Sequence, residues 1–231
     1  MLQAIGLTKN YGELVALDSL DLTVSKGEVF CLLGQNGAGK TTTINLFLGF
    51  IAATSGIAKI NDTEITFNST ASRRHLAYIP EVVMLYENLS GIENLQFFSK
   101  LAGFNYSTLQ LRSYLSKVGL KEEVHNKYLG IYSKGMRQKV GIAIALAKNA
   151  EAILMDEPTS GLDPKAISEF TTIVKQLANE GKSILMATHD IFNAVNIGSR
   201  IGIMKEGTLV HISEKNSITA TELQRLYLKT I

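Results

Sequence analysis

The stretch from Gly34 to Thr42, with the sequence GQNGAGKTT, constrains the fold of this chain more than any other feature. The apolar run Val29 to Leu33 precedes it, and Thr43 to Leu48 follows it with a helical pattern. Glycines at three positions of the stretch allow backbone angles that side chains forbid. The sequence therefore predicts a strand, a glycine-rich loop and a helix in direct succession.

This order of elements is typical of a phosphate-binding loop. Consecutive N–H groups of such a loop turn inward around a phosphate, and the helix that follows directs its positive end at the same anion. Lys40 is expected to reach the outer phosphates, and Thr41 is expected to offer its hydroxyl group to Mg²⁺. The pattern G-x-x-x-x-G-K-[ST] thus predicts nucleotide binding.

Charge balance and apolar runs exclude several classes of protein. The 23 Lys and Arg residues against 21 Asp and Glu residues leave a net charge of +2, which is too balanced for a nucleic-acid-binding arm or a polybasic membrane anchor. The longest apolar run, Val140 to Ala147, is far shorter than the ~20 residues of a membrane span. The one cysteine, Cys31, lies in an apolar strand pattern and is expected in the core. We therefore expect a cytoplasmic protein without a nucleic-acid partner.

The remaining patterns predict an α/β fold in a single domain spanning residues 1–231. Alternating apolar residues predict strands in residues 2–33, and buried-strand runs recur at 152–155 and 183–187. A small antiparallel sheet is expected beside the mainly parallel one, from short strands at 57–60, 64–67 and 76–79. From about residue 91 to 145 the apolar spacing becomes helical, which predicts an inserted helical subdomain. Residues 200–204 and 208–212 are expected to form a hairpin.

Two carboxylates, Asp156 and Glu157, follow the apolar run at residues 152–155. Where a phosphate-binding loop is present, an Asp at the end of a neighbouring strand holds Mg²⁺ together with the loop Thr, and a second acid can polarise water. The alternative is that the two acids simply begin a solvated loop. The sequence favours the metal and catalytic roles because the loop is present.

The residues alone leave two alternative roles open at each of three further positions. Tyr11 lies in a turn-like segment where its ring could stack on a base or pack in the core. Ser133, with Gly135 beside it, precedes a long helical pattern and could bind an anion or cap the helix in the ordinary way. His189 follows a predicted strand and could contact a phosphate or be a loop residue.

Taken together, these motifs resemble, in order and spacing, the ATP-binding subunits of ABC transporters over nearly the whole chain. The resemblance implies that the glycine loop is the Walker A motif, that Asp156 ends the Walker B motif, and that Glu157 is the catalytic carboxylate. It also implies that His189 is the switch histidine, that Ser160 to Asp163 is the D-loop, and that Tyr11 stacks on adenine. The implied nucleotide-binding residues are Tyr11, Gly34, Asn36, Gly37, Ala38, Gly39, Lys40, Thr41, Thr42, Ser133 and Gly135.

Two segments depart from the usual pattern of this family. Tyr132 to Met136, YSKGM, stands where the family signature reads Leu-Ser-Gly-Gly-Gln, and Glu81 replaces the more common glutamine. Both departures look like the branch that serves drug, sodium or polysaccharide export. The implied cofactors are ATP and Mg²⁺, with Thr41, Glu81 and Asp156 as the expected metal-binding residues.

The resemblance implies a mechanism shared between two copies of the chain. Each ATP is expected to be held by the Walker A motif of one copy and capped by Ser133 of the other, in a homodimer that drives a separate transmembrane permease at the inner face of the membrane. The alternatives are a DNA-repair or translation ATPase of the same family and a simple P-loop kinase. The compact interval from Thr42 to Ser133 disfavours a repair protein with a long coiled coil, and the single ATPase unit disfavours a translation factor with two.

Overall fold

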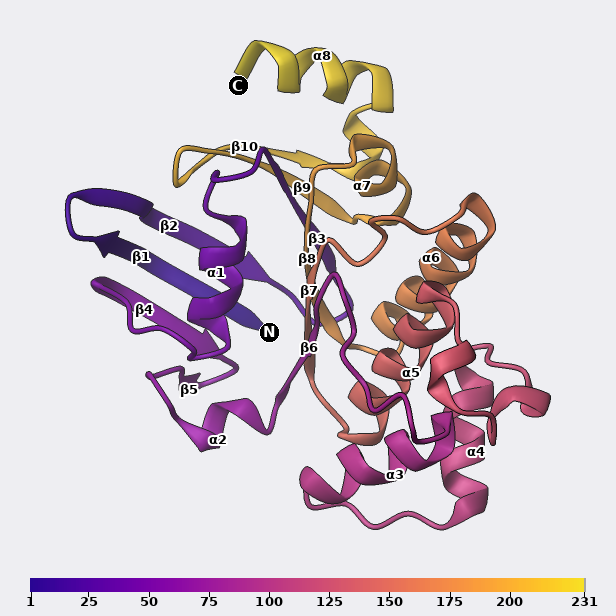
Figure 1. Ribbon diagram of the computed structural model, residues 1–231. Helices are drawn as coiled ribbons and strands as arrows, with labels where there is room; N and C mark the ends of the chain where they lie inside the picture. The colour runs from indigo at the N-terminus through magenta and orange to yellow at the C-terminus, as the bar shows by residue number, and fades with distance from the viewer. Residues whose placement is uncertain (231) are drawn as a thin grey trace.

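A six-stranded sheet forms the centre of the computed structural model, which describes residues 1–230 (Figure 1). Its strand order is β10-β9-β3-β8-β7-β6, and all neighbouring strands are parallel except β9 and β10. The strands are β3 Val29–Gly34, β6 Leu76–Ile79, β7 Ala152–Asp156, β8 Ser183–Thr188, β9 Arg200–Lys205 and β10 Thr208–Glu214. The predicted hairpin after residue 200 is confirmed as β9 and β10.

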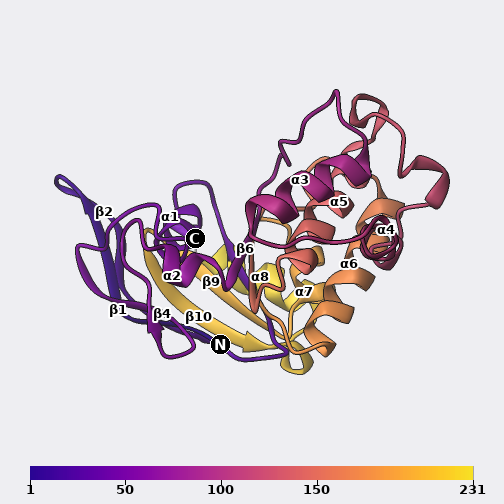
Figure 2. The same ribbon diagram turned by 90° about the horizontal axis from the view of Figure 1, so that it is seen from below.

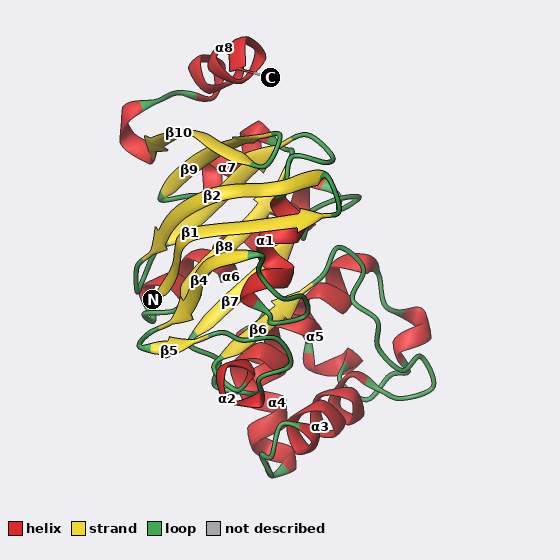
Figure 3. Ribbon diagram, turned by 90° about the vertical axis from the view of Figure 1, so that its left-hand side faces the viewer, coloured by secondary structure: helices red, strands yellow, loops and turns green. Residues whose placement is uncertain are grey.

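A second, antiparallel sheet lies against the first one, in the order β2-β1-β4-β5. Its strands are β1 Leu2–Tyr11, β2 Leu14–Val24, β4 Ser55–Ile60 and β5 Thr63–Glu64. Helix α1, Lys40–Phe47, lies between the two sheets, as Figure 3 shows. The predicted combination of a mainly parallel sheet and a small antiparallel one is therefore confirmed.

Alternation along β3 divides the interior into two cores. Val29, Cys31 and Leu33 belong to the core on the helical side of the central sheet, while Phe30 and Leu32 belong to the core between the two sheets. All five side chains are at most 1% exposed. A strand buried on both faces must be apolar at every position, which is why this segment reads as a continuous hydrophobic run. The predicted core position of Cys31 is confirmed.

The other helices pack on the opposite face of the central sheet or flank it (Figure 2). They are α2 Thr70–Arg73, α3 Gly91–Leu101, α4 Thr108–Lys117, α5 Lys134–Ala147, α6 Pro164–Asn179, α7 Ile191–Ile197 and α8 Ala220–Thr230, with short 3₁₀ turns at Glu122–Val124, Leu129–Ile131 and Lys215–Ser217. Helices α3, α4 and α5 pack on one another, as the helical spacing predicts. Within residues 1–230 no helix combines the length and the apolar composition needed to cross a membrane.

Two of the predicted strands are placed differently by the structure. The strand expected at residues 64–67 is wrong, because β5 ends at Glu64 and the chain then turns, with Asn68 at a φ of 58°. The strand at Leu76–Ile79 exists, but it pairs with β7 in the central sheet and not with the small sheet. Helices α2 and α7 were not predicted, because four and seven residues are too few to show a helical period.

Candidate functional site

Three parallel strands of the central sheet, β3, β8 and β7, end at one edge and bring candidate residues together there. In the ladder, Leu33 pairs with Thr188, and Asp156 pairs with Ala187. The glycine loop after β3, the acids at the end of β7 and the histidine after β8 are therefore level with one another. The carboxyl ends of parallel strands are the usual place for a ligand in such a sheet.

At this edge, the backbone of the glycine loop has a conformation that can bind an anion. Gly37 and Gly39 have φ angles of 83° and 103°, which favour glycine. Gly39 is the N-cap of α1. Because glycine has no side chain, this residue makes no side-chain hydrogen bond to the first-turn N–H groups of the helix. The first-turn N–H groups of α1 thus retain the capacity to bind a phosphate.

Lys40 lies beneath this loop and is only 5% exposed. Its Nζ donates hydrogen bonds to the carbonyl oxygens of Gly34 at 2.6 Å and Gln35 at 3.0 Å, and it lies 3.9 Å from Glu157 Oε1. Burial lowers the pKa of Lys40, and the nearby carboxylates of Glu157 and Asp156 oppose that shift. The side chain is therefore a partly desolvated cation that an additional anion would stabilise.

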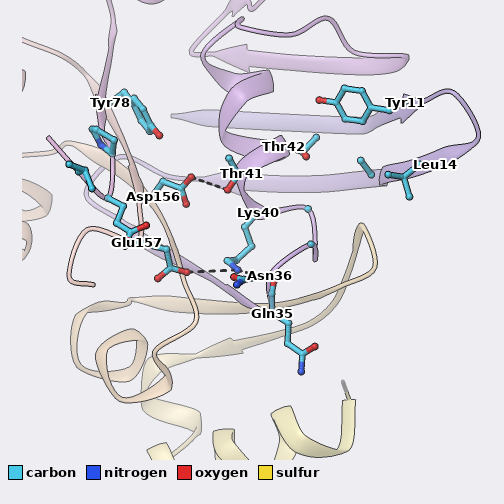
Figure 4. Close-up of a pocket in the computed structure, with 16 residues that line it drawn as sticks. Tyr11, Leu14, Gln35, Asn36, Lys40, Thr41, Thr42, Tyr78, Asp156 and Glu157 are labelled. Atoms are coloured by element: carbon cyan, nitrogen blue, oxygen red, sulfur yellow. Dashed lines mark hydrogen bonds and ion pairs between the residues drawn. The ribbon is translucent and has the colours of Figure 1, made fainter. Parts of the chain in front are cut away.

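Thr41 and Asp156 meet across the cleft, as the dashed line in Figure 4 shows. Thr41 Oγ1 donates to Asp156 Oδ2 at 2.9 Å. Burial raises the pKa of Asp156, while the hydrogen bond from Thr41 lowers it. No cluster of three or more His, Cys, Asp or Glu able to hold a metal occurs in the described part of the chain. The pair fits Mg²⁺, which commonly takes one or two protein oxygens and completes its shell with phosphate oxygens and water.

Glu157 has a buried carboxylate oxygen that contacts the His189 ring and lies 3.9 Å from Lys40 Nζ. This atom, Oε1, lies 2.9 Å from His189 Nδ1, and the backbone N–H of His189 donates to Oε2 at 3.3 Å. The Glu157 backbone has a φ of 45°, and its N–H donates to Ala187 O at 2.9 Å. Residues with a strained backbone cluster at active sites.

A cleft of about 730 Å³ joins these groups (Figure 4). Its lining includes the sequence-predicted residues Tyr11, Asn36, Gly37, Gly39, Lys40, Thr41, Thr42, Glu81, Asp156 and Glu157. Gly34 and Ala38 belong to the same loop but do not line the cleft. His189 does not line it either and reaches it through Glu157.

Several lining residues were missed by the sequence analysis. Leu14 and Ala16 lie two apart on β2, beside Tyr11, whose side chain is itself about half exposed at 49%. The sequence contains a pattern that could have identified Leu14, because a two-residue turn after Tyr11 brings Leu14 directly opposite Tyr11 in the sheet. Tyr78 of β6 also lines the cleft, and burial with the nearby Asp156 raises its pKa. Its position depends on the pairing of β6, which the sequence analysis assigned to the wrong sheet.

Ser133 and Gly135 lie elsewhere on the molecule. They line a separate cavity of about 180 Å³ between α5 and α6, which shares no described lining residue with the cleft. Ser133 Oγ accepts a hydrogen bond from Met136 N at 3.3 Å, as an ordinary helix cap does. A Cβ on Gly135 would lie 3.2 Å from Ala166 Cβ. One copy of the chain therefore does not bring Ser133 to its own cleft.

Glu81 lies at the edge of the cleft, but its carboxylate has partners of its own. Ser160 Oγ donates to Glu81 Oε1 at 2.7 Å, and Lys134 Nζ lies 4.0 Å from the same oxygen. The two departures from the family pattern, Glu81 and Lys134, thus lie next to each other in space. No local sequence pattern reveals this contact, because the two residues are 53 positions apart along the chain.

Comparison with known proteins places these features in a family. The sequence profile described as "ABC transporter" matches residues 17–160. The bacitracin transport ATP-binding protein BcrA of Enterococcus faecalis is 37% identical over 211 residues, which cover 91% of this chain and 68% of BcrA. The lantibiotic transport ATP-binding protein SrtF of Streptococcus pyogenes is 33% identical over 227 residues, which cover 98% of this chain and 96% of SrtF.

A solved structure shows the same fold. It is a dimeric ATP-binding cassette in a post-hydrolysis state, bound to ADP and Pi. It is similar to this chain with a TM-score of 0.82 at 26% sequence identity, and the match covers 94% of this chain and 100% of that one.

Proposed function

The chain belongs to the ABC transporter family as an ATP-binding subunit that hydrolyses ATP, and we propose which of its residues perform each part of that activity. The observation that carries the proposal is the convergence of Lys40, Thr41, Asp156 and Glu157 on one cleft from separate segments of the chain. In this proposal the first-turn N–H groups of α1 and the Lys40 ammonium bind the outer phosphates of ATP. The Tyr11 ring, at the other end of the cleft, stacks on adenine.

Thr41 and Asp156 are the proposed holders of Mg²⁺, which would neutralise charge on the phosphates when bound. Their hydrogen-bonded oxygens at 2.9 Å are the observation that supports this assignment. Glu81 is proposed as a metal-sensing residue at the edge of the cleft. To approach the metal, its carboxylate would have to leave Ser160 and Lys134.

Glu157 is the proposed catalytic base. Its carboxylate lines the cleft between Lys40 and His189, which supports a role as acceptor of a proton from an attacking water. His189, whose Nδ1 lies 2.9 Å from Glu157 Oε1, is proposed to hold Glu157 in position and to contact the γ-phosphate. In this proposal Lys40 binds the phosphates, Glu157 accepts a proton from the attacking water, and the loop N–H groups stabilise the negative charge that develops on the phosphate.

Ser133 and Gly135 act, in this proposal, on the cleft of a second copy. They lie at the start of α5 and outside their own cleft, so only another molecule can present them to a bound nucleotide. The assembly is a homodimer that closes around two ATP molecules. The similarity to a dimeric cassette supports this assignment.

The transport partner is proposed to be a separate permease in the membrane, with this chain bound at its inner face. The loop from Glu81 to Ser90 and helix α3 expose Met84 at 80% and Phe97 at 41%, which offers an apolar surface for such a partner. The named relatives transport bacitracin and a lantibiotic, so we propose an exporter of drug-like or peptide antibiotics. A substitution at Tyr86, which is 48% exposed, should then reduce binding to the permease, whereas Val83 belongs to the core and Leu85 packs against it.

A kinetic comparison of three variants tests the catalytic assignment. Glu157→Gln should bind ATP normally but lose turnover by about 10²-fold or more, since an amide cannot take up the proton. His189→Ala should also lose turnover. Glu180→Gln, which changes a surface carboxylate paired with Lys117, is the matched control and should behave as wild type. Near wild-type hydrolysis by Glu157→Gln would refute its assignment as the base.

A further inference from the structure

One buried hydrogen bond joins the two segments that carry the proposed catalytic pair. Asn193 Nδ2 donates to Thr159 Oγ1 at 2.7 Å, and the two residues are 3% and 6% exposed. Thr159 lies two residues after Glu157, and Asn193 lies four residues after His189. The bond therefore connects the loop of the acid to the helix that begins beside the histidine.

The position of His189 depends on that helix, because its own side chain is 61% exposed and is not held by packing. Helix α7 begins at Ile191, with Asp190 as its N-cap, whose Oδ1 accepts from Asn193 N at 3.0 Å. Asp190 N in turn donates to Thr188 Oγ1 at 3.1 Å. Since α7 has only seven residues, its stability comes from tertiary contacts and not from its own length.

The conformation of the loop that carries Glu157 also depends on its surroundings. Glu157 has a left-handed backbone at a φ of 45°, and such strain persists only where the surroundings hold it. Two turn hydrogen bonds follow it, from Ser160 N to Glu157 O at 3.1 Å and from Leu162 N to Thr159 O at 3.2 Å. Thr159 is thus part of the turn that fixes the direction of the Glu157 side chain.

We propose that Thr159 and Asn193 are positioning residues, whose hydrogen bond sets the separation between Glu157 Oε1 and His189 Nδ1. This inference rests on the catalytic roles proposed above. Without the Thr159 hydroxyl, the Asn193 amide is buried with no acceptor, and α7 relieves that cost by shifting. A shift of His189 relative to Glu157 lowers the rate of the chemical step and leaves the ATP-binding groups of the glycine loop unchanged.

The test compares Thr159→Val, which removes the hydroxyl at nearly constant volume, with Thr159→Ser, which keeps it. Thr159→Val should lower kcat by roughly tenfold with an unchanged KM for ATP, whereas Thr159→Ser should keep the wild-type kcat. Wild-type kcat in Thr159→Val would overturn the proposal. Equal losses in both variants would also overturn it, because Thr159→Ser keeps the hydroxyl group and its loss could not come from a missing hydrogen bond.

A second comparison separates positioning from general stability. Thr159→Val combined with Asn193→Leu replaces both partners by apolar groups, which should restore thermal stability if the single change lowers it or prevents folding. The double variant should still show the reduced kcat. Recovery of kcat together with stability would show that the bond only maintains the fold, and the proposal would then be wrong.

The His189→Ala background shows whether the bond acts through the histidine. In that background Thr159→Val should cause no further loss of kcat, because the group being positioned is already absent. A further tenfold loss there would overturn the proposal. If Glu157→Gln and His189→Ala themselves kept near wild-type turnover, the catalytic assignment would fail. If they lost turnover while Thr159→Val did not, only the positioning role would fail.

Discussion

Gly39→Ala should destabilise the chain strongly, because the glycine loop approaches β2 at this residue. Gly39 has a φ of 103°, and a Cβ built there would lie 2.7 Å from the Ala16 carbonyl oxygen and 2.9 Å from Met204 Cε. The methionine methyl group can move aside, but the carbonyl belongs to the β2 backbone. A left-handed backbone costs a side-chain-bearing residue about 1–3 kcal/mol, and the overpacking adds about 1–3 kcal/mol. The expected loss is thus roughly 2–6 kcal/mol of unfolding free energy.

Gly37→Ala provides a matched control in the same loop. Gly37 also has a left-handed backbone, with a φ of 83°, but a Cβ there would meet nothing within 4 Å. Only the backbone cost remains, so this variant should lose about 1–3 kcal/mol. Urea denaturation of both variants without nucleotide measures the two losses directly.

The difference between the two variants is the decisive quantity. Gly39→Ala should be less stable than Gly37→Ala by at least about 1 kcal/mol, the lower bound of the overpacking cost. Equal losses would refute the reasoning, because they would mean that the loop does not lie against Ala16 as described.

Three further predictions concern the charged groups of the cleft. Lys40→Ala should abolish tight ATP binding in a nucleotide titration, since it removes the buried ammonium beneath the loop; unchanged affinity would contradict its assigned role. Asp156→Asn should stabilise the protein at neutral pH. Burial raises the folded-state pKa of Asp156, so its contribution to stability is present at acidic pH and is lost as pH rises through the folded pKa; denaturation at pH 7 and near pH 4 should show the gain only at pH 7. Glu81→Gln should change the Mg²⁺ dependence of hydrolysis more than the affinity for ATP, and identical metal titrations would reject that expectation.

Local chemistry explains why much of the fold and site could be predicted from the sequence. The glycine pattern, the apolar run before Asp156 and the helical spacing after residue 91 each depend on neighbouring residues. Their backbone preferences and periodicities are therefore visible in a single chain. The strand, loop and helix around Lys40 followed directly from such a pattern.

Contacts between distant segments could not be predicted in the same way. The pairing of Leu76–Ile79 with β7 is decided by which sheet edge is open to another strand, and the short apolar run fits either sheet. The contact of Glu81 with Lys134 and the bond from Asn193 to Thr159 depend on the packing of whole helices. No local sequence pattern predicts contacts between such distant residues.

Each ATP site is proposed to be completed by the Ser133 region of a second copy, and sedimentation of the Glu157→Gln variant can measure this assembly. With ATP, which this variant binds but does not turn over, the chain should sediment as a dimer holding two nucleotides, and with ADP it should return to the monomer. Ser133→Ala in the same background should weaken the dimer without weakening ATP binding to the monomer. A chain that remains monomeric at saturating ATP, or a dimer that is indifferent to nucleotide, would contradict the account.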